Sequence, residues 1–174
     1  MDGTFPLIED LKEVCFNVPL HDQTYLHSTL LDGLMDLFIS RGFLVERERF
    51  VSHSHYYRTW MMPLKKKGFI DLYAFNDHWK VAIEFDTGNI LKCRSIEKLL
   101  ESGADIAIGI AGARCAAPVL QSNIRKVMKA SEYAGPIKNK FWIILLGKRV
   151  AEEIGRGMNG LTQDHSCLGP GRKN

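Results

Sequence analysis

The chain of 174 residues is 45% hydrophobic and 25% charged, which excludes a disordered or fibrous protein and suits one domain with a buried core. No apolar run approaches the roughly 18 residues that a membrane-spanning helix requires, so the sequence predicts a soluble, cytoplasmic protein without a membrane partner. The four cysteines are scattered without the spacing of a zinc site, and we expect them to be reduced thiols.

The net charge of +3 conceals a strong asymmetry along the chain. Residues 1–40 hold one base and seven acids, whereas residues 41–67 hold seven bases and two acids. Residues 68–111 hold four bases and seven acids, and residues 112–174 hold eleven bases and four acids. An acidic segment between basic ones suits a carboxylate site on a surface that attracts polyanions, although ordinary solvated charge explains the pattern equally well.

The first third of the chain predicts two helices and a strand. Residues 1–21 form an acidic extension with scattered apolar side chains, which we expect to pack as an additional helix. From Asp22, apolar residues recur at helical spacing as far as Gly42, which suits a C-terminal cap. Residues 43–51 alternate as in a strand, and the polar, aromatic and basic residues 52–67 predict a loop or a long hairpin excursion.

The rest of the chain predicts alternating strands and helices. The expected elements are a hairpin of strands over 68–75 and 79–86, a helix over 95–102, a strand over 105–110, an amphipathic helix over 118–134, a strand over 141–146 and a short helix over 150–154. This order predicts an α/β fold with a mixed four- to five-stranded sheet flanked by helices on both faces. We expect a single domain over residues 1–154 and a flexible tail over 155–174.

Three carboxylates of the predicted hairpin are candidates for a site. Glu84 and Asp86 occupy alternate positions of one strand and therefore share a face, and Asp71 interrupts the apolar partner strand. If the hairpin brings them together, their repulsion favours a bound cation, and Mg²⁺ is commonly held by one or two carboxylates. The alternative is that Asp71 ends a strand and that Glu84 forms an ion pair with Lys80, Lys92 or Arg94.

The residues of this hairpin resemble a known family. The segments 68–72 (GFIDL) and 81–89 (VAIEFDTGN), with the order helix, three strands, helix and strand, resemble the core of the PD-(D/E)xK, or restriction-endonuclease-like, nuclease superfamily. The resemblance covers roughly residues 22–111. It implies that Asp71 and Glu84 bind a metal ion, Mg²⁺ or Mn²⁺, beside the backbone carbonyl of Ile83, and that the protein hydrolyses phosphodiesters.

The sequence departs from this family at the position of the motif lysine, which is Asp86. The resemblance leaves three possibilities: Asp86 acts as a base or an additional ligand, a lysine from elsewhere replaces the missing one, or the fold binds nucleic acid without cutting it. Lys80, Lys92 and Lys98 are the candidate replacements, with a slight preference for Lys98.

Residues 53–67 combine aromatic and basic side chains in a way that suits nucleic-acid binding. The candidate contacts are Arg58, Trp60, Lys65, Lys66 and Lys67, and a solvated loop is the alternative. On the helix expected from Asp22 to Gly42, Asp32 and Asp36 could join the metal site, but a solvated helix face is the better interpretation.

The sequence thus predicts a magnesium-dependent DNA endonuclease with Asp71, Glu84, Asp86 and Lys98 in its catalytic site. Such an enzyme would be associated with the nucleoid and would act as a homodimer or with a larger protein partner, since cutting both strands of a duplex usually needs two sites. The alternative is a catalytically degenerate protein of the same fold that serves as a nucleic-acid-binding or assembly subunit.

Overall fold

The computed structural model describes residues 5–20, 23–55, 64–112, 118–134 and 137–154. The helices are α1 (Ile8–Asn17), α2 (Gln23–Ser40), α3 (Cys93–Glu101) and α4 (Pro118–Ala134), with a 3₁₀ helix, η1 (Leu146–Lys148). The strands are β1 (Leu44–His55), β2 (Leu64–Phe75), β3 (Lys80–Asp86), β4 (Ile106–Ala111), β5 (Lys140–Leu145) and β6 (Val150–Ile154). Within these residues no helix is both long enough and apolar enough to cross a bilayer.

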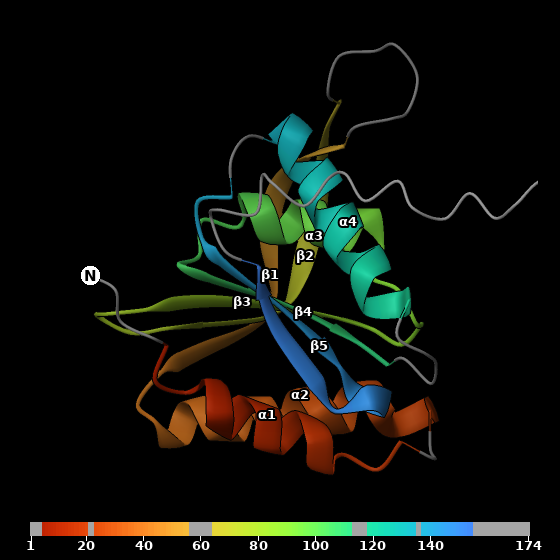
Figure 1. Ribbon diagram of the computed structural model, residues 1–174. Coiled ribbons are helices and arrows are strands. Elements are labelled where there is room, and N and C mark those ends of the chain that lie inside the picture. Colours follow the sequence, from red (N-terminus) through yellow and green to blue (C-terminus); the bar gives the residue numbers. More distant parts are fainter. Residues whose placement is uncertain (1–4, 21–22, 56–63, 113–117, 135–136, 155–174) are drawn as a thin grey trace, which may run out of the picture.

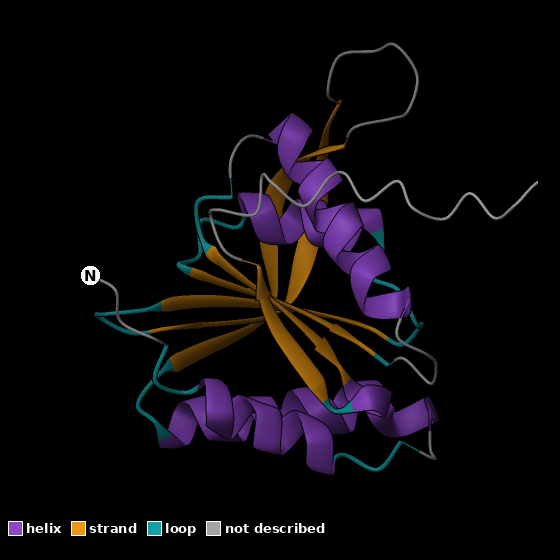
Figure 2. Cartoon of the chain, viewed as in Figure 1, coloured by secondary structure: helices purple, strands orange, loops and turns teal. Residues whose placement is uncertain are grey.

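The strands form one mixed sheet in the order β1-β2-β3-β4-β5-β6. The first three strands are antiparallel, β3, β4 and β5 are parallel, and β6 returns antiparallel to β5. Helices α1 and α2 cover one face of the sheet, and α3 and α4 cover the other (Figures 1 and 2). The prediction of an α/β fold with a mixed sheet between helices is therefore confirmed.

The alternation of side chains along β3 shows how the two faces are used. Val81, Ile83 and Phe85 pack in the apolar cluster beneath α1 and α2. Ala82 belongs to the cluster on the other face, and Glu84 and Asp86 follow it at alternate positions. All seven residues of the strand except Lys80 are buried, so the two carboxylates are carried into the interior beside α3.

Strands β2 and β3 separate partway along their length. Their pairing runs from Phe75 opposite Lys80 to Leu72 opposite Ile83, whereas β2 continues back to Leu64 in pairing with β1 alone. In β1, Glu48 has a left-handed backbone with φ of 53° at the same level. The β1–β2 hairpin bends there, and its far end stands beside α3 (Figure 1). This bend opens the sheet at Asp71.

Two predictions about strands were wrong. Over the described residues the sheet has six strands and not four to five, because residues 150–154 form strand β6 and not a short helix. Val150 and Ile154 have helical spacing in the sequence, but both lie opposite residues of β5, Leu145 and Phe141. The turn that makes this possible is η1, followed by Arg149 with φ of 51°, which reverses the chain after β5.

The segment 52–67 belongs in large part to the hairpin, because β1 extends to His55 and β2 begins at Leu64. The long hairpin excursion was thus the better of the two interpretations. The helix expected in the amino-terminal extension is α1. The tail over 155–174 lies outside the described residues.

Candidate active site

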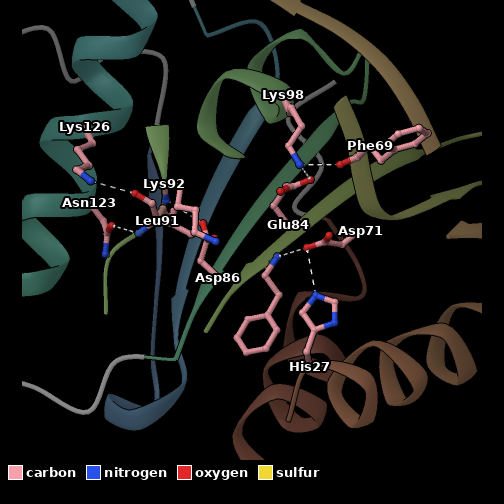
Figure 3. Close-up of polar contacts among 11 residues, drawn as sticks. His27, Phe69, Asp71, Glu84, Asp86, Leu91, Lys92, Lys98, Asn123 and Lys126 are labelled. Atoms are coloured by element: carbon pink, nitrogen blue, oxygen red, sulfur yellow. Dashed lines mark hydrogen bonds and ion pairs between the residues drawn. The ribbon is translucent and has the colours of Figure 1, made fainter. Parts of the chain in front are cut away.

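Asp71 lies where β2 leaves β3, and its side chain takes the place of the lost strand pairing. The Phe85 amide donates a hydrogen bond of 2.8 Å to Asp71 Oδ2 (Figure 3). A backbone amide that has lost its partner strand is costly to leave unpaired, and the Asp71 carboxylate supplies the missing acceptor. The predicted approach of Asp71 to the strand that carries Glu84 is therefore present.

Glu84 is paired with Lys98, which reaches it from α3. Lys98 Nζ donates hydrogen bonds of 2.5 Å to Glu84 Oε1 and 2.6 Å to the Phe69 carbonyl (Figure 3). The Glu84 side chain is 3% exposed and the Lys98 side chain 11% exposed. Ile96 and Leu99 of α3 pack in the apolar cluster on this face of the sheet, and that packing fixes the helix that carries Lys98. The lysine slightly preferred from the sequence is the one that meets the second acid.

The charge of Glu84 is strongly influenced by its surroundings. Burial is the largest cause that raises the pKa of Glu84, and the neighbouring charge of Asp71 raises it further. Hydrogen bonding and charge from Lys98 oppose the shift, and the pKa of Glu84 is about 7. The mutual repulsion of two such carboxylates would be reduced by a cation bound between them.

Asp86 forms a second pair, with Lys92. Asp86 Oδ1 accepts a hydrogen bond of 2.8 Å from Lys92 Nζ, and Oδ2 accepts one of 2.8 Å from the Lys92 backbone amide. The Asp86 side chain is 3% exposed, whereas that of Lys92 is 74% exposed. The hydrogen bond to Asp86, and then its charge, raises the pKa of Lys92.

His27 of α2 enters the site from the opposite face of the sheet, and the sequence did not indicate it. Its Nε2 lies 3.7 Å from Asp71 Oδ2, and its ring stacks on Phe85 at 5.5 Å between centroids. No motif surrounds this histidine in the sequence, since its position depends on how α2 packs on the sheet. Asp32 and Asp36, the acids of the same helix that were considered, are exposed, and Asp32 pairs with Arg47 at 3.0 Å.

These groups surround one pocket of about 350 Å³. Its charged lining consists of Asp71, Glu84 and Asp86 together with Lys92, Arg94 and Lys98. Three acids and three bases of one small pocket thus come from β2, β3, α3 and the residue before α3. The acids of such a pocket can bind a cation, and its bases can bind an anion that accompanies the cation.

The other predicted site residues lie elsewhere or cannot be described. Ile83 is fully buried on the side of α1 and α2, with its backbone opposite Leu72. Arg58 and Trp60 lie outside the described residues. Lys65 and Lys66 are in β2, and their side chains lie outside the description; Lys67 is exposed.

The carboxylates of the pocket bear on whether it could hold a divalent ion. Among the described residues, no three His, Cys, Asp or Glu side chains are gathered closely enough to hold a metal ion. The charge of Asp71 nevertheless raises the pKa of Glu84, so the two groups interact. Two carboxylates suffice for Mg²⁺ when water and substrate oxygens complete its shell. Asp86 is already bonded through both oxygens to Lys92.

Comparison of the chain with protein-family models, with curated proteins and with solved structures found no match.

Proposed function

We propose that this protein is a magnesium- or manganese-dependent endonuclease of the PD-(D/E)xK type that hydrolyses phosphodiesters in DNA. The observation that supports this most is the meeting of three groups from three elements in one pocket. Asp71 stands where β2 leaves β3, Glu84 follows on β3, and Lys98 of α3 bonds Glu84 at 2.5 Å. This arrangement supports one of the three possibilities that the resemblance leaves open, in which a lysine from elsewhere in the chain replaces the motif lysine.

In this proposal Asp71 and Glu84 would hold the metal ion, whose chemistry would be to activate water and to stabilise charge on the phosphodiester. Deprotonation of Glu84 is a condition for its role, because a protonated carboxyl binds a cation weakly. Since the pKa of Glu84 is about 7, the site gains its second anionic ligand as the pH rises through neutrality.

Lys98 holds the reacting groups in place in this proposal. An ammonium has three donors, and Lys98 uses two of them on Glu84 and on the Phe69 carbonyl. The third is free to bind a water molecule or a phosphate oxygen. Its burial prevents the side chain from swinging out, so the charge remains at the inner end of the pocket.

A specific observation favours a second function, that of a degenerate nuclease-like subunit which binds nucleic acid or assembles with a partner without cutting. Each buried carboxylate of β3 already has a lysine against it, Glu84 with Lys98 and Asp86 with Lys92. A lysine ammonium can balance the charge of a buried carboxylate without a metal ion. Binding without cleavage would be the result.

Cleavage assays separate the two functions. Purified protein is incubated with plasmid, linear duplex and branched DNA in Mg²⁺ and in Mn²⁺, and the same DNA forms are titrated by fluorescence anisotropy. The endonuclease predicts metal-dependent cleavage that Asp71→Asn lowers by a factor of at least about 100. Asp77→Asn, an exposed acid in the turn of the same hairpin, is the matched control and keeps full activity.

Binding of DNA without cleavage by the wild type would replace the endonuclease by the second function. Neither binding nor cleavage would remove both. Sedimentation of the protein with and without DNA tests the expected homodimer.

A further inference from the structure

The loop between β3 and α3 is anchored at Leu91. The Leu91 side chain is fully buried and lies against Gly109 of β4. A Cβ atom added at Gly109 would come within 2.5 Å of Leu91 Cδ1, so the glycine leaves the space that this side chain fills. The loop therefore has one position on the sheet.

Helix α4 holds the two polar groups of the same residue. Asn123 Oδ1 accepts a hydrogen bond of 2.8 Å from the Leu91 amide, and Lys126 Nζ donates one of 3.1 Å to the Leu91 carbonyl (Figure 3). Asn123 and Lys126 are three residues apart and so lie on one face of α4. Asn123 is fully buried. A side chain and both backbone groups of Leu91 are thus fixed from two directions.

The residue that this anchor delivers is Lys92. Its amide and its ammonium both bond the buried Asp86, so backbone and side chain are held by the same carboxylate. The Lys92 side chain is nevertheless 74% exposed and lines the pocket. Lys98, at 11% exposed, is enclosed between Glu84 and Phe69, so the two lysines occupy an outer and an inner position.

We propose that Lys92 binds a phosphate group of the DNA substrate at the mouth of the pocket, and that Asn123 and Lys126 are positioning residues that hold it there through Leu91. This inference rests on the proposed function and adds to it a role for Asp86, which orients Lys92. Of the three donors of the Lys92 ammonium, one bonds Asp86, and two remain for phosphate oxygens.

Asp86 also stabilises the charged form of this ammonium. Hydrogen bonding and attraction from Asp86 raise the pKa of Lys92, and the charges of Asp71 and Glu84 act in the same direction. A lysine on a free loop would lose side-chain entropy on binding, whereas this one is held before the phosphate arrives. Preorganisation of this kind affects affinity for substrate more than the rate of the chemical step.

The test is steady-state kinetics on a short fluorescent duplex, with binding of the same duplex measured by anisotropy in EDTA. Lys92→Met is expected to raise KM and the dissociation constant by about tenfold, with kcat changed less, and to lower the salt dependence of binding by about one phosphate contact. Lys92→Arg keeps the charge and restores most of the affinity. Lys80→Met, an exposed lysine at the far end of β3, is the control and binds as the wild type does.

The positioning residues are tested by Asn123→Ala and Lys126→Met, each expected to raise KM by about threefold, roughly half of the tenfold effect in free-energy terms. Asn123→Asp retains an acceptor for the Leu91 amide, so its KM is expected to return to the wild-type value. If Asn123 had only a structural role, the KM of Asn123→Asp would not differ from that of Asn123→Ala. Lys129→Met, on an exposed position of the same helix, is the matched control.

A wild-type KM and dissociation constant in Lys92→Met, with cleavage intact, would overturn this inference and leave the endonuclease standing. If the wild type itself neither binds nor cuts DNA, the proposed function fails first, and this inference fails with it.

Discussion

The two faces of the sheet are covered by two helices each, yet their interiors differ in kind. Beneath α1 and α2 the buried residues are apolar, with Phe5, Leu30, Leu34 and Phe38 among the largest. Beneath α3 and α4 the described structure buries polar and charged residues as well: Glu84, Asp86, Ser95, Glu97, Lys98, Asn123 and Asn139. All buried polar residues recorded among the described residues are on this second side.

The difference indicates where the molecule obtains its stability and where it places its chemistry. An apolar layer stabilises by burial alone, whereas buried charges cost desolvation that their partners only partly return. Proteins retain such charges most often at sites that act on a ligand. The face of α1 and α2 thus contributes mainly to stability. Among the described residues, His27 and Phe85 are the side chains of this face that line the pocket.

The largest effect is expected from a cavity in the apolar layer. Phe38→Ala removes a fully buried ring of α2 and should lower the free energy of unfolding by about 3–5 kcal/mol. Urea denaturation measures this change. Ile39→Ala, at the adjacent and 55% exposed position, should stay within about 0.5 kcal/mol of the wild type.

The comparison of the two faces predicts that Phe38→Ala leaves DNA affinity unchanged at temperatures where the variant is folded. A loss of affinity equal to that of a site variant would show that the apolar layer is not independent of the pocket.

A smaller effect, and one that depends on pH, is expected on the polar face. The pKa of Glu84 is raised in the folded protein to about 7, from 4.5 for a free glutamate, so the folded state binds the proton more tightly than the unfolded state does. The stability from this group is therefore present at low pH and is lost as the pH rises toward and through about 7. We expect the free energy of unfolding of the wild type to fall by about 1–3 kcal/mol as the pH rises from below 4.5 to above about 7.

Denaturation of Glu84→Gln over the same pH range checks this, because the variant should lack this loss. Glu132→Gln, at an exposed glutamate of α4, should retain it. Lys98→Met removes the group that lowers the pKa of Glu84, so the loss should extend to higher pH. A wild-type profile that is flat from acid to neutral pH would contradict the described burial of the Glu84 charge.

The smallest effect tests the link between the polar face and the loop before α3. Gly109→Ala forces Leu91 to move and should cost about 1 kcal/mol of stability. It should also weaken DNA binding, since Lys92 moves with Leu91. Gly88→Ala meets no atom within 4 Å and is the control in the same loop. Equal DNA affinities for the two variants would separate Lys92 from its anchor.

Much of the fold could be predicted because it depends on local periodicity. The alternation over 81–86 correctly gave Glu84 and Asp86 a common face, and the helical spacing from Asp22 to Gly42 gave α2. Strand β6 could not be recognised, since Val150 and Ile154 fit a helix equally well and only the pairing with β5 decides.

The site could be predicted only in part, because several of its contacts join residues far apart in the sequence. Lys92 was considered as a partner for Glu84, but the chain turns so that it reaches Asp86 instead. The approach of His27 to Asp71 spans two faces of the sheet, and the bonds of Asn123 and Lys126 to Leu91 depend on the docking of α4. No spacing along the chain records such contacts.

The bend of β1 at Glu48 has a consequence for the behaviour of the protein in solution. β1 is an edge of the sheet, and a long flat edge offers free backbone groups to which another chain can add a strand. Glu48, a left-handed residue in the middle of that strand, interrupts its flatness, and the run Glu46-Arg47-Glu48-Arg49 places charged side chains along it. At the opposite edge, β6 carries Glu152 and Glu153. The same distortion that opens the pocket therefore also protects the sheet from aggregation through its edges.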